Sequence, residues 1–145
     1  MAMLARDRSL SPPVAKQFLI YPMLDDSKVK QQPALEAVAM WSIERNITAW
    51  SAYLRADFGT DRVSPCAAPI RATSVEGLPP TYMDTGTLDL YRDEILRHTS
   101  RIAAAHIETE LHVLLGLPHV YDLFAPFCGP SKRAMEGRMR QIRKL

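Results

Sequence analysis

The chain has 145 residues, a length that suits one domain with a single hydrophobic core. Hydrophobic residues make up 47% and charged residues 23%, which is the ordinary balance of a soluble globular protein. The formal net charge of +2 is too small to indicate a nucleic-acid or membrane partner, and the lack of a long apolar run excludes a predicted membrane-spanning helix.

The cysteines and the first residues bear on the cellular compartment. Cys66 and Cys128 form no motif, so the count allows a disulfide, but two reduced thiols in a cytosolic protein is the simpler interpretation. Arg6, Asp7 and Arg8 follow directly on the apolar start, which is not the pattern of a signal peptide. A cytoplasmic location is therefore favoured.

The first third of the chain predicts a helix end and a buried strand. Residues Met1–Arg8 suit the end of a helix, and the two prolines in Ser9–Pro13 break it. Lys16–Tyr21 contains the apolar run Phe18 to Ile20, which is typical of a strand buried on both faces.

A polar stretch then leads into two predicted helices, which together form a helical segment over residues 33–58. Pro33 can begin the first helix, whose apolar positions run from Leu35 to Ile43. Asn46 is a candidate N-cap for the second, with Trp50 on its apolar face together with Tyr53 and Leu54. The following residues, 57–78, lack periodicity and predict a long connection.

The remaining chain alternates strands and helices. Strands are predicted over Thr81–Thr85 and Thr109–Leu115, with a helix over Arg92–Ala105 between them. The inner stripe of that helix is expected to contain Ile95, Thr99, Ile102 and Ala103. Ser131 can cap a last helix, in which Met135, Met139 and Ile142 share a face. Strands that alternate with helices predict an α/β fold with a parallel sheet.

This topology brings Asp89 and His119 towards one another. Each follows the carboxyl end of a predicted strand, and strands joined by a crossover helix usually lie side by side. A carboxylate beside an imidazole fixes its tautomer and stabilises its charged form, so the pair could serve acid–base catalysis. The alternative is that Asp89 caps the following helix and His119 is an ordinary loop residue.

Four segments in order resemble the hormone-sensitive-lipase-like carboxylesterase family of the α/β-hydrolase fold. They are the stretch QFLIYPMLDD (Gln17–Asp26), the loop VSPCAAP (Val63–Pro69), the stretch LPPTYMDTGTLDLYRDE (Leu78–Glu94) and the stretch ELHVLLGLPHVYD (Glu110–Asp122). The resemblance runs over nearly the whole chain, and it implies that residues 1–145 are the C-terminal part of such a fold, with about three parallel strands, flanking helices and a lid at residues 33–58.

The resemblance also assigns the candidate catalytic residues. Asp89 falls at the position of the catalytic acid, in DLYRDE, and His119 at that of the catalytic histidine. Val120 departs from the pattern, since the family often has glycine after the histidine, and a β-branched residue resists a positive φ. The resemblance implies a small-molecule ester as the substrate. It implies no cofactor and no metal.

The family's nucleophile is absent from the sequence. None of the serines of the chain lies in a G-x-S-x-G elbow, and there is no HGGG-type oxyanion loop. The resemblance places both before Met1, so we expect the isolated chain to be inactive as an esterase. The alternative is a non-catalytic binding or interaction module that pairs with a partner through the exposed edge of the Lys16–Tyr21 strand.

The other chemistry-bearing residues favour structural roles. His98, His106 and His112 lack metal-ligand spacing; the first two are expected on the surface, and His112 should point outward from its strand. The basic residues of the last helix, near the C-terminus, are typical of a solvated helix face. Trp41 and Trp50 either line a substrate site or pack their helices, and packing is favoured.

Overall fold

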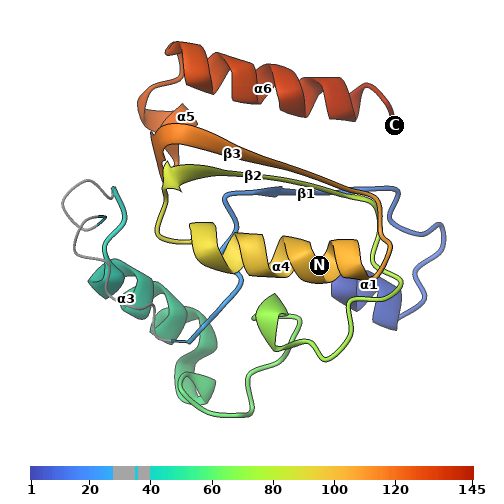
Figure 1. Cartoon of the computed structure of the whole chain (residues 1–145). Coiled ribbons are helices and arrows are strands. Elements are labelled where there is room, and N and C mark those ends of the chain that lie inside the picture. Colours follow the sequence, from blue (N-terminus) through green and yellow to red (C-terminus); the bar gives the residue numbers. More distant parts are fainter. Residues whose placement is uncertain (28–34, 36–39) are drawn as a thin grey trace.

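A parallel three-stranded sheet lies at the centre of the computed structural model, which describes residues 1–27, 35 and 40–145 (Figure 1). The strands β1 (Gln17–Ile20), β2 (Thr81–Leu88) and β3 (Thr109–Pro118) are hydrogen-bonded in that order. This confirms the predicted α/β fold with three parallel strands. Both later strands run three residues further than predicted.

Helices cover both faces of the sheet. Figure 1 shows α6 (Gly129–Ile142) on one side of the strands, and α4 (Arg92–Ala104) with α1 (Ala2–Asp7) on the other. The remaining helical elements are α3 (Ile43–Leu54), the short α5 (Tyr121–Phe124) and two 3-10 turns, η1 (Arg55–Asp57) and η2 (Pro69–Arg71). The helix predicted to begin at Pro33 lies, apart from Leu35, largely outside the described residues.

The main core lies between β2 and α4. Met83 of β2 and Ile95 and Ile102 of α4 are fully buried and belong to one apolar cluster. The predicted inner stripe of α4 is right except for Ala103, which is exposed. At 100° per residue Ala103 lies at the border of this stripe, and His98 takes a buried place on it instead.

The start of α3 differs from the prediction. Ser42, not Asn46, is the N-cap, and its Oγ accepts a hydrogen bond from the backbone N–H of Arg45 at 3.2 Å. The helix therefore begins four residues earlier, and Asn46 becomes a buried residue of its first turns. Its side-chain oxygen accepts a hydrogen bond from the Tyr91 hydroxyl at 2.9 Å, so this amide is used in tertiary packing rather than capping.

The C-terminal helix is turned differently from the expectation. Cys128 is the N-cap of α6, and Ser131 lies inside the helix. The face of Met135, Met139 and Ile142 is exposed, whereas Arg138 is buried against the sheet. The prediction of a solvated basic face is therefore wrong for Arg138. A buried guanidinium is stable only when it is paired, and two carboxylates supply that pairing.

Candidate acid–histidine site

Asp89 is a buried carboxylate directly after β2. Its Oδ1 accepts the backbone N–H of Tyr91 at 2.9 Å, and its Oδ2 accepts the hydroxyl of Thr85 at 3.2 Å. The side chain is fully inaccessible to solvent. These two donors fix the carboxylate plane, and Oδ2 can accept a further hydrogen bond from a partner on the side of β3.

His119 is that partner. It follows β3 directly, and its Nδ1 lies 3.1 Å from Oδ2 of Asp89, while only 11% of its side chain is exposed. With the carboxylate as acceptor, Nδ1 carries the proton and the Nε2 lone pair is left available, a tautomer that we assign from the hydrogen-bond network. The structure thus brings together the two residues that the sequence predicted to be neighbours.

The pairing of β2 with β3 brings them to the same edge. The register is regular from Thr81 opposite Thr109 to Gly86 opposite Leu114, and it then shifts so that Leu88 lies opposite Pro118. Gly86 is required at this shift, because a Cβ atom there would lie 1.8 Å from the carbonyl oxygen of Leu117. The absence of a side chain lets the two strand ends approach closely.

Aromatic rings enclose the imidazole of His119. Tyr21 and Tyr91 meet it edge to face, with ring centroids 5.0 Å and 4.9 Å away and interplanar angles of 75° and 74°. Trp41 lies at 6.0 Å. Sequence reasoning gave Tyr21 and Tyr91 no role. Both follow carboxyl ends of strands at the same edge of the sheet: Tyr21 directly follows β1, and Tyr91 comes two residues after Asp89.

Three carboxyl groups, apart from Asp89, make hydrogen bonds in or to the loop after β1. Asp26 receives two hydrogen bonds from Arg71, at 2.6 and 2.8 Å, and Asp25 receives one from Arg97 at 2.9 Å. Glu94 is also buried here, and its Oε1 accepts the backbone N–H of Leu24 at 2.6 Å. These three carboxyl groups hold the loop after β1 in place.

The other histidines lie apart from the site. His98 was expected on the surface but is 1% exposed, and burial lowers its pKa to about 4. His106 is exposed as expected, and His112 is half-buried with its Nε2 2.6 Å from Glu110. Trp50 packs in a small cluster with Val63, as its packing interpretation required. Within the described part of the chain, no three histidine, cysteine or carboxylate side chains form a potential metal site.

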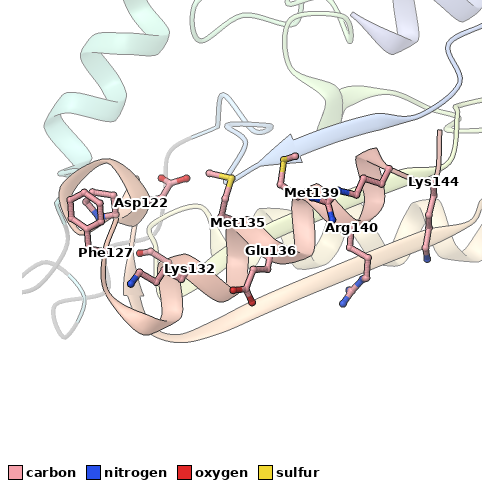
Figure 2. Close-up of a pocket in the computed structure, with 11 residues that line it drawn as sticks. Asp122, Phe127, Lys132, Met135, Glu136, Met139, Arg140 and Lys144 are labelled. Atoms are coloured by element: carbon pink, nitrogen blue, oxygen red, sulfur yellow. The ribbon is translucent and has the colours of Figure 1, made fainter.

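A surface hollow of about 650 Å³ lies along α6, away from the acid–histidine pair. Figure 2 shows Asp122 and Phe127 near the first turn of the helix and Met135 and Met139 along it. The hollow is bounded by Asp122, Pro126, Phe127, Ser131, Lys132, Met135, Glu136, Met139, Arg140, Arg143 and Lys144. Neither Asp89 nor His119 borders it.

The described residues contain no helix that is long and apolar enough to cross a bilayer. No serine hydroxyl in this part of the chain hydrogen-bonds His119, which is bonded through its side chain to Asp89.

Comparison with known proteins gives consistent matches. A model of the alpha/beta hydrolase fold family matches residues 1–123. The chain is 30% identical over 125 residues to Esterase LipI of Mycobacterium tuberculosis, covering 86% of this chain and 39% of that protein. A structure titled Bacterial Heroin Esterase matches with a TM-score of 0.87 and 34% identity, covering 99% of this chain and 46% of that one.

An esterase from the bacterial hormone-sensitive lipase family matches with a TM-score of 0.83 and 25% identity, covering 99% of this chain and 48% of that one. The chain therefore spans less than half the length of each of these relatives.

Proposed function

Because the chain belongs to the alpha/beta hydrolase fold family, as a hormone-sensitive-lipase-like member, we propose that it supplies the acid and the histidine of a carboxylic-ester hydrolase. The observation that carries this proposal is the 3.1 Å contact between Nδ1 of His119 and Oδ2 of Asp89 at one edge of the sheet. Hydrolases of this class use a carboxylate that is hydrogen-bonded to an imidazole, which in turn is hydrogen-bonded to a serine hydroxyl.

In the proposed reaction, His119 transfers protons and Asp89 orients it. A serine hydroxyl attacks the ester carbonyl as Nε2 of His119 takes its proton; the alcohol then leaves with that proton, and an acyl-serine remains. Water repeats the sequence and releases the acid. The serine would come from outside the 145 residues, since none of the chain's own serines lies in a G-x-S-x-G elbow.

Residues 33–58, of which α3 is the main described part, are proposed as a lid over this site. Two contacts support this assignment. The ring of Trp41, next to the start of α3, has its centroid 6.0 Å from that of His119. Asn46 of α3 accepts a hydrogen bond from Tyr91, whose ring packs on the imidazole. Movement of α3 would therefore disturb the surroundings of the catalytic base.

The first experiment measures the mass of the endogenous protein, which is detected with an antibody raised against the C-terminal residues 132–145. A band about twice the size of this chain supports a complete esterase. In that longer protein, Asp89→Asn should lower kcat by roughly 10⁴-fold, because the amide is neutral and its NH₂ group can donate to Nδ1, which holds the imidazole in the wrong tautomer. His119→Ala should also lower kcat, because it removes the proposed base. The matched controls at exposed positions are Asp61→Asn and His106→Ala, which should leave kcat unchanged.

The 145-residue chain tested alone gives the complementary result. We expect no ester turnover above background and no labelling by a fluorophosphonate probe, because each absent oxyanion-hole donor alone is worth about 3–4 kcal/mol of barrier. Labelling of a serine in this chain contradicts the assignment of the nucleophile to another segment. Unchanged kcat in Asp89→Asn of the longer protein contradicts the proposal as a whole.

The second candidate function is non-catalytic pairing through β1. The supporting observation is that β1 hydrogen-bonds within the described sheet to β2 alone, at the edge of the order β1-β2-β3. An edge strand of this kind presents backbone donors and acceptors to a partner. Sedimentation equilibrium over a wide concentration range tests it: self-association through Lys16–Tyr21 predicts a dimer at high concentration, and a monomer throughout refutes it.

A further inference from the structure

Arg138 stands at the centre of a buried cluster behind the acid–histidine pair. Its Nε and Nη2 donate to the two oxygens of Asp84 at 2.7 and 3.0 Å, and its Nη1 donates to Asp122. Nη2 also lies 2.9 Å from the hydroxyl of Tyr121. The guanidinium therefore joins α6 to β2 and to α5, the short helix that follows His119.

A hydrogen bond and a ring contact connect this cluster to the imidazole. The Tyr21 hydroxyl donates to Oδ1 of Asp122 at 3.0 Å, and the Tyr21 ring meets His119 edge to face at 5.0 Å. Hydrogen bonds from Arg138 and Tyr21 outweigh the effect of burial and hold the pKa of Asp122 below its usual value. Burial, followed by the hydrogen bond to Asp122, raises the pKa of Tyr21 to about 12, so its hydroxyl remains a donor.

The backbone around His119 needs such support. Tyr21 and Val120 have φ angles of +35° and +52°, which are unfavourable for residues with a side chain. Val120 directly follows His119, and α5 is too short to be stable by itself. Arg138 holds the side chains of both Tyr121 and Asp122, and it thereby supports this segment together with the apolar packing of Tyr121.

We infer that Arg138 is a positioning residue for His119, acting through Asp122 and Tyr21 to hold the imidazole against Asp89. This inference rests on the proposed function. It assigns a role in the reaction to the C-terminal helix, which lies beyond residues 1–123 matched by the family model. Arginine suits this role because its planar fork holds two carboxylates in fixed directions, which a lysine cannot do.

The test is the NMR spectrum of the full chain labelled with ¹⁵N-histidine. Nδ1–H of His119, bonded to Asp89, should give a downfield proton and the nitrogen shifts of a single tautomer. Arg138→Lys keeps the charge but loses the fork, and Tyr21→Phe keeps the ring but loses the link to Asp122. In both variants we expect the downfield proton to exchange with water roughly three- to tenfold faster, as the loss of one hydrogen bond implies.

Two controls separate positioning from stability. Arg143→Lys changes an exposed arginine of the same region, and Ile102→Val weakens the core under β2. Neither should alter the His119 signals. Tyr21→Phe leaves the buried ion pairs intact, so it decides the question even where Arg138→Lys fails to fold.

Asp89→Asn distinguishes failure of the Arg138 inference from failure of the proposed function. If it abolishes the downfield proton while Tyr21→Phe and Arg138→Lys leave exchange and tautomer unchanged, the role of Arg138 is refuted and the acid–histidine pair stands. If Asp89→Asn itself leaves the His119 signals unchanged, the proposed function and this inference both fall.

Discussion

Replacing Glu94 by glutamine should remove a loss of stability that the wild-type protein suffers as the pH rises from 6.5 to 8. Glu94 is 5% exposed, and its Oε1 accepts the backbone N–H groups of Leu24 and Asp25 at 2.6 and 3.3 Å. Burial raises its pKa to about 8, and the nearby charge of Asp25 adds to the rise. The folded protein therefore keeps a proton that the unfolded chain has already lost.

The sign and size of the effect follow from proton linkage. Where the folded state binds more protons than the unfolded state, stability falls as the pH rises, by at most about 1.4 kcal/mol per pH unit for one group. A folded pKa of about 8 against an unfolded value of 4.5 gives a loss of about 1.5 kcal/mol between pH 6.5 and 8.

His98 opposes this trend mainly at lower pH. Burial lowers its pKa to about 4, so the unfolded chain holds the extra proton between about 4 and 6.5, and stability rises with pH there. Above pH 6.5, where the unfolded imidazole loses the rest of its proton, the remaining rise is only about 0.4 kcal/mol. His98 is the same in wild type and Glu94→Gln, so the difference between the two proteins from pH 6.5 to 8 isolates Glu94.

Urea denaturation at fixed protein concentration, followed by tryptophan fluorescence, measures the effect. Between pH 6.5 and 8, wild type should lose about 1.5 kcal/mol relative to Glu94→Gln, which keeps the accepting oxygen but has no titrating group there. Glu136→Gln removes an exposed carboxylate of α6 and should behave as wild type. An equal pH dependence in wild type and Glu94→Gln would show that the buried carboxyl is ionised at pH 6.5, and the reasoning would be refuted.

Three further substitutions test the geometry of the site. Gly86→Ala should destabilise by about 1–3 kcal/mol or more in urea titrations, because its Cβ would lie 1.8 Å from the backbone oxygen of Leu117; a neutral effect would contradict the close strand approach. Val120→Gly should raise the free energy of unfolding by up to about 1 kcal/mol by relieving the positive φ, and a loss of stability would refute that strain. Asn46→Ala should cost about 1–3 kcal/mol, because the buried Tyr91 hydroxyl loses its acceptor, and Tyr91→Phe in that background should recover part of the loss.

The strands and the acid–histidine pair were predictable because their signals are local. A short apolar run such as Phe18–Ile20 indicates a strand buried on both faces without knowledge of the partner strand. The alternation of strand and helix then favours a parallel sheet, in which the residues after successive strands meet at one edge. Asp89 and His119 follow from that rule together with the family motifs.

The prediction for α6 was wrong because helical periodicity shows which residues share a face but not which face is covered. Met135, Met139 and Ile142 do share a face, yet it is exposed, since the sheet carries the buried carboxylate of Asp84 opposite Arg138. A buried ion pair between residues 54 positions apart leaves no mark in the local pattern. His98 was misplaced for the same reason: its burial depends on the packing of α4 rather than on its neighbours in sequence.

The sequence by itself determined the parallel α/β order, the family resemblance and the expected pairing of Asp89 with His119, because each depends on short patterns or on the order of elements. Only the tertiary structure decided what surrounds His119. The edge contacts of Tyr21 and Tyr91, and the Arg138 cluster behind them, join segments far apart in the chain. Such contacts arise from the angles and distances at which packed elements meet, which periodicity and composition do not specify.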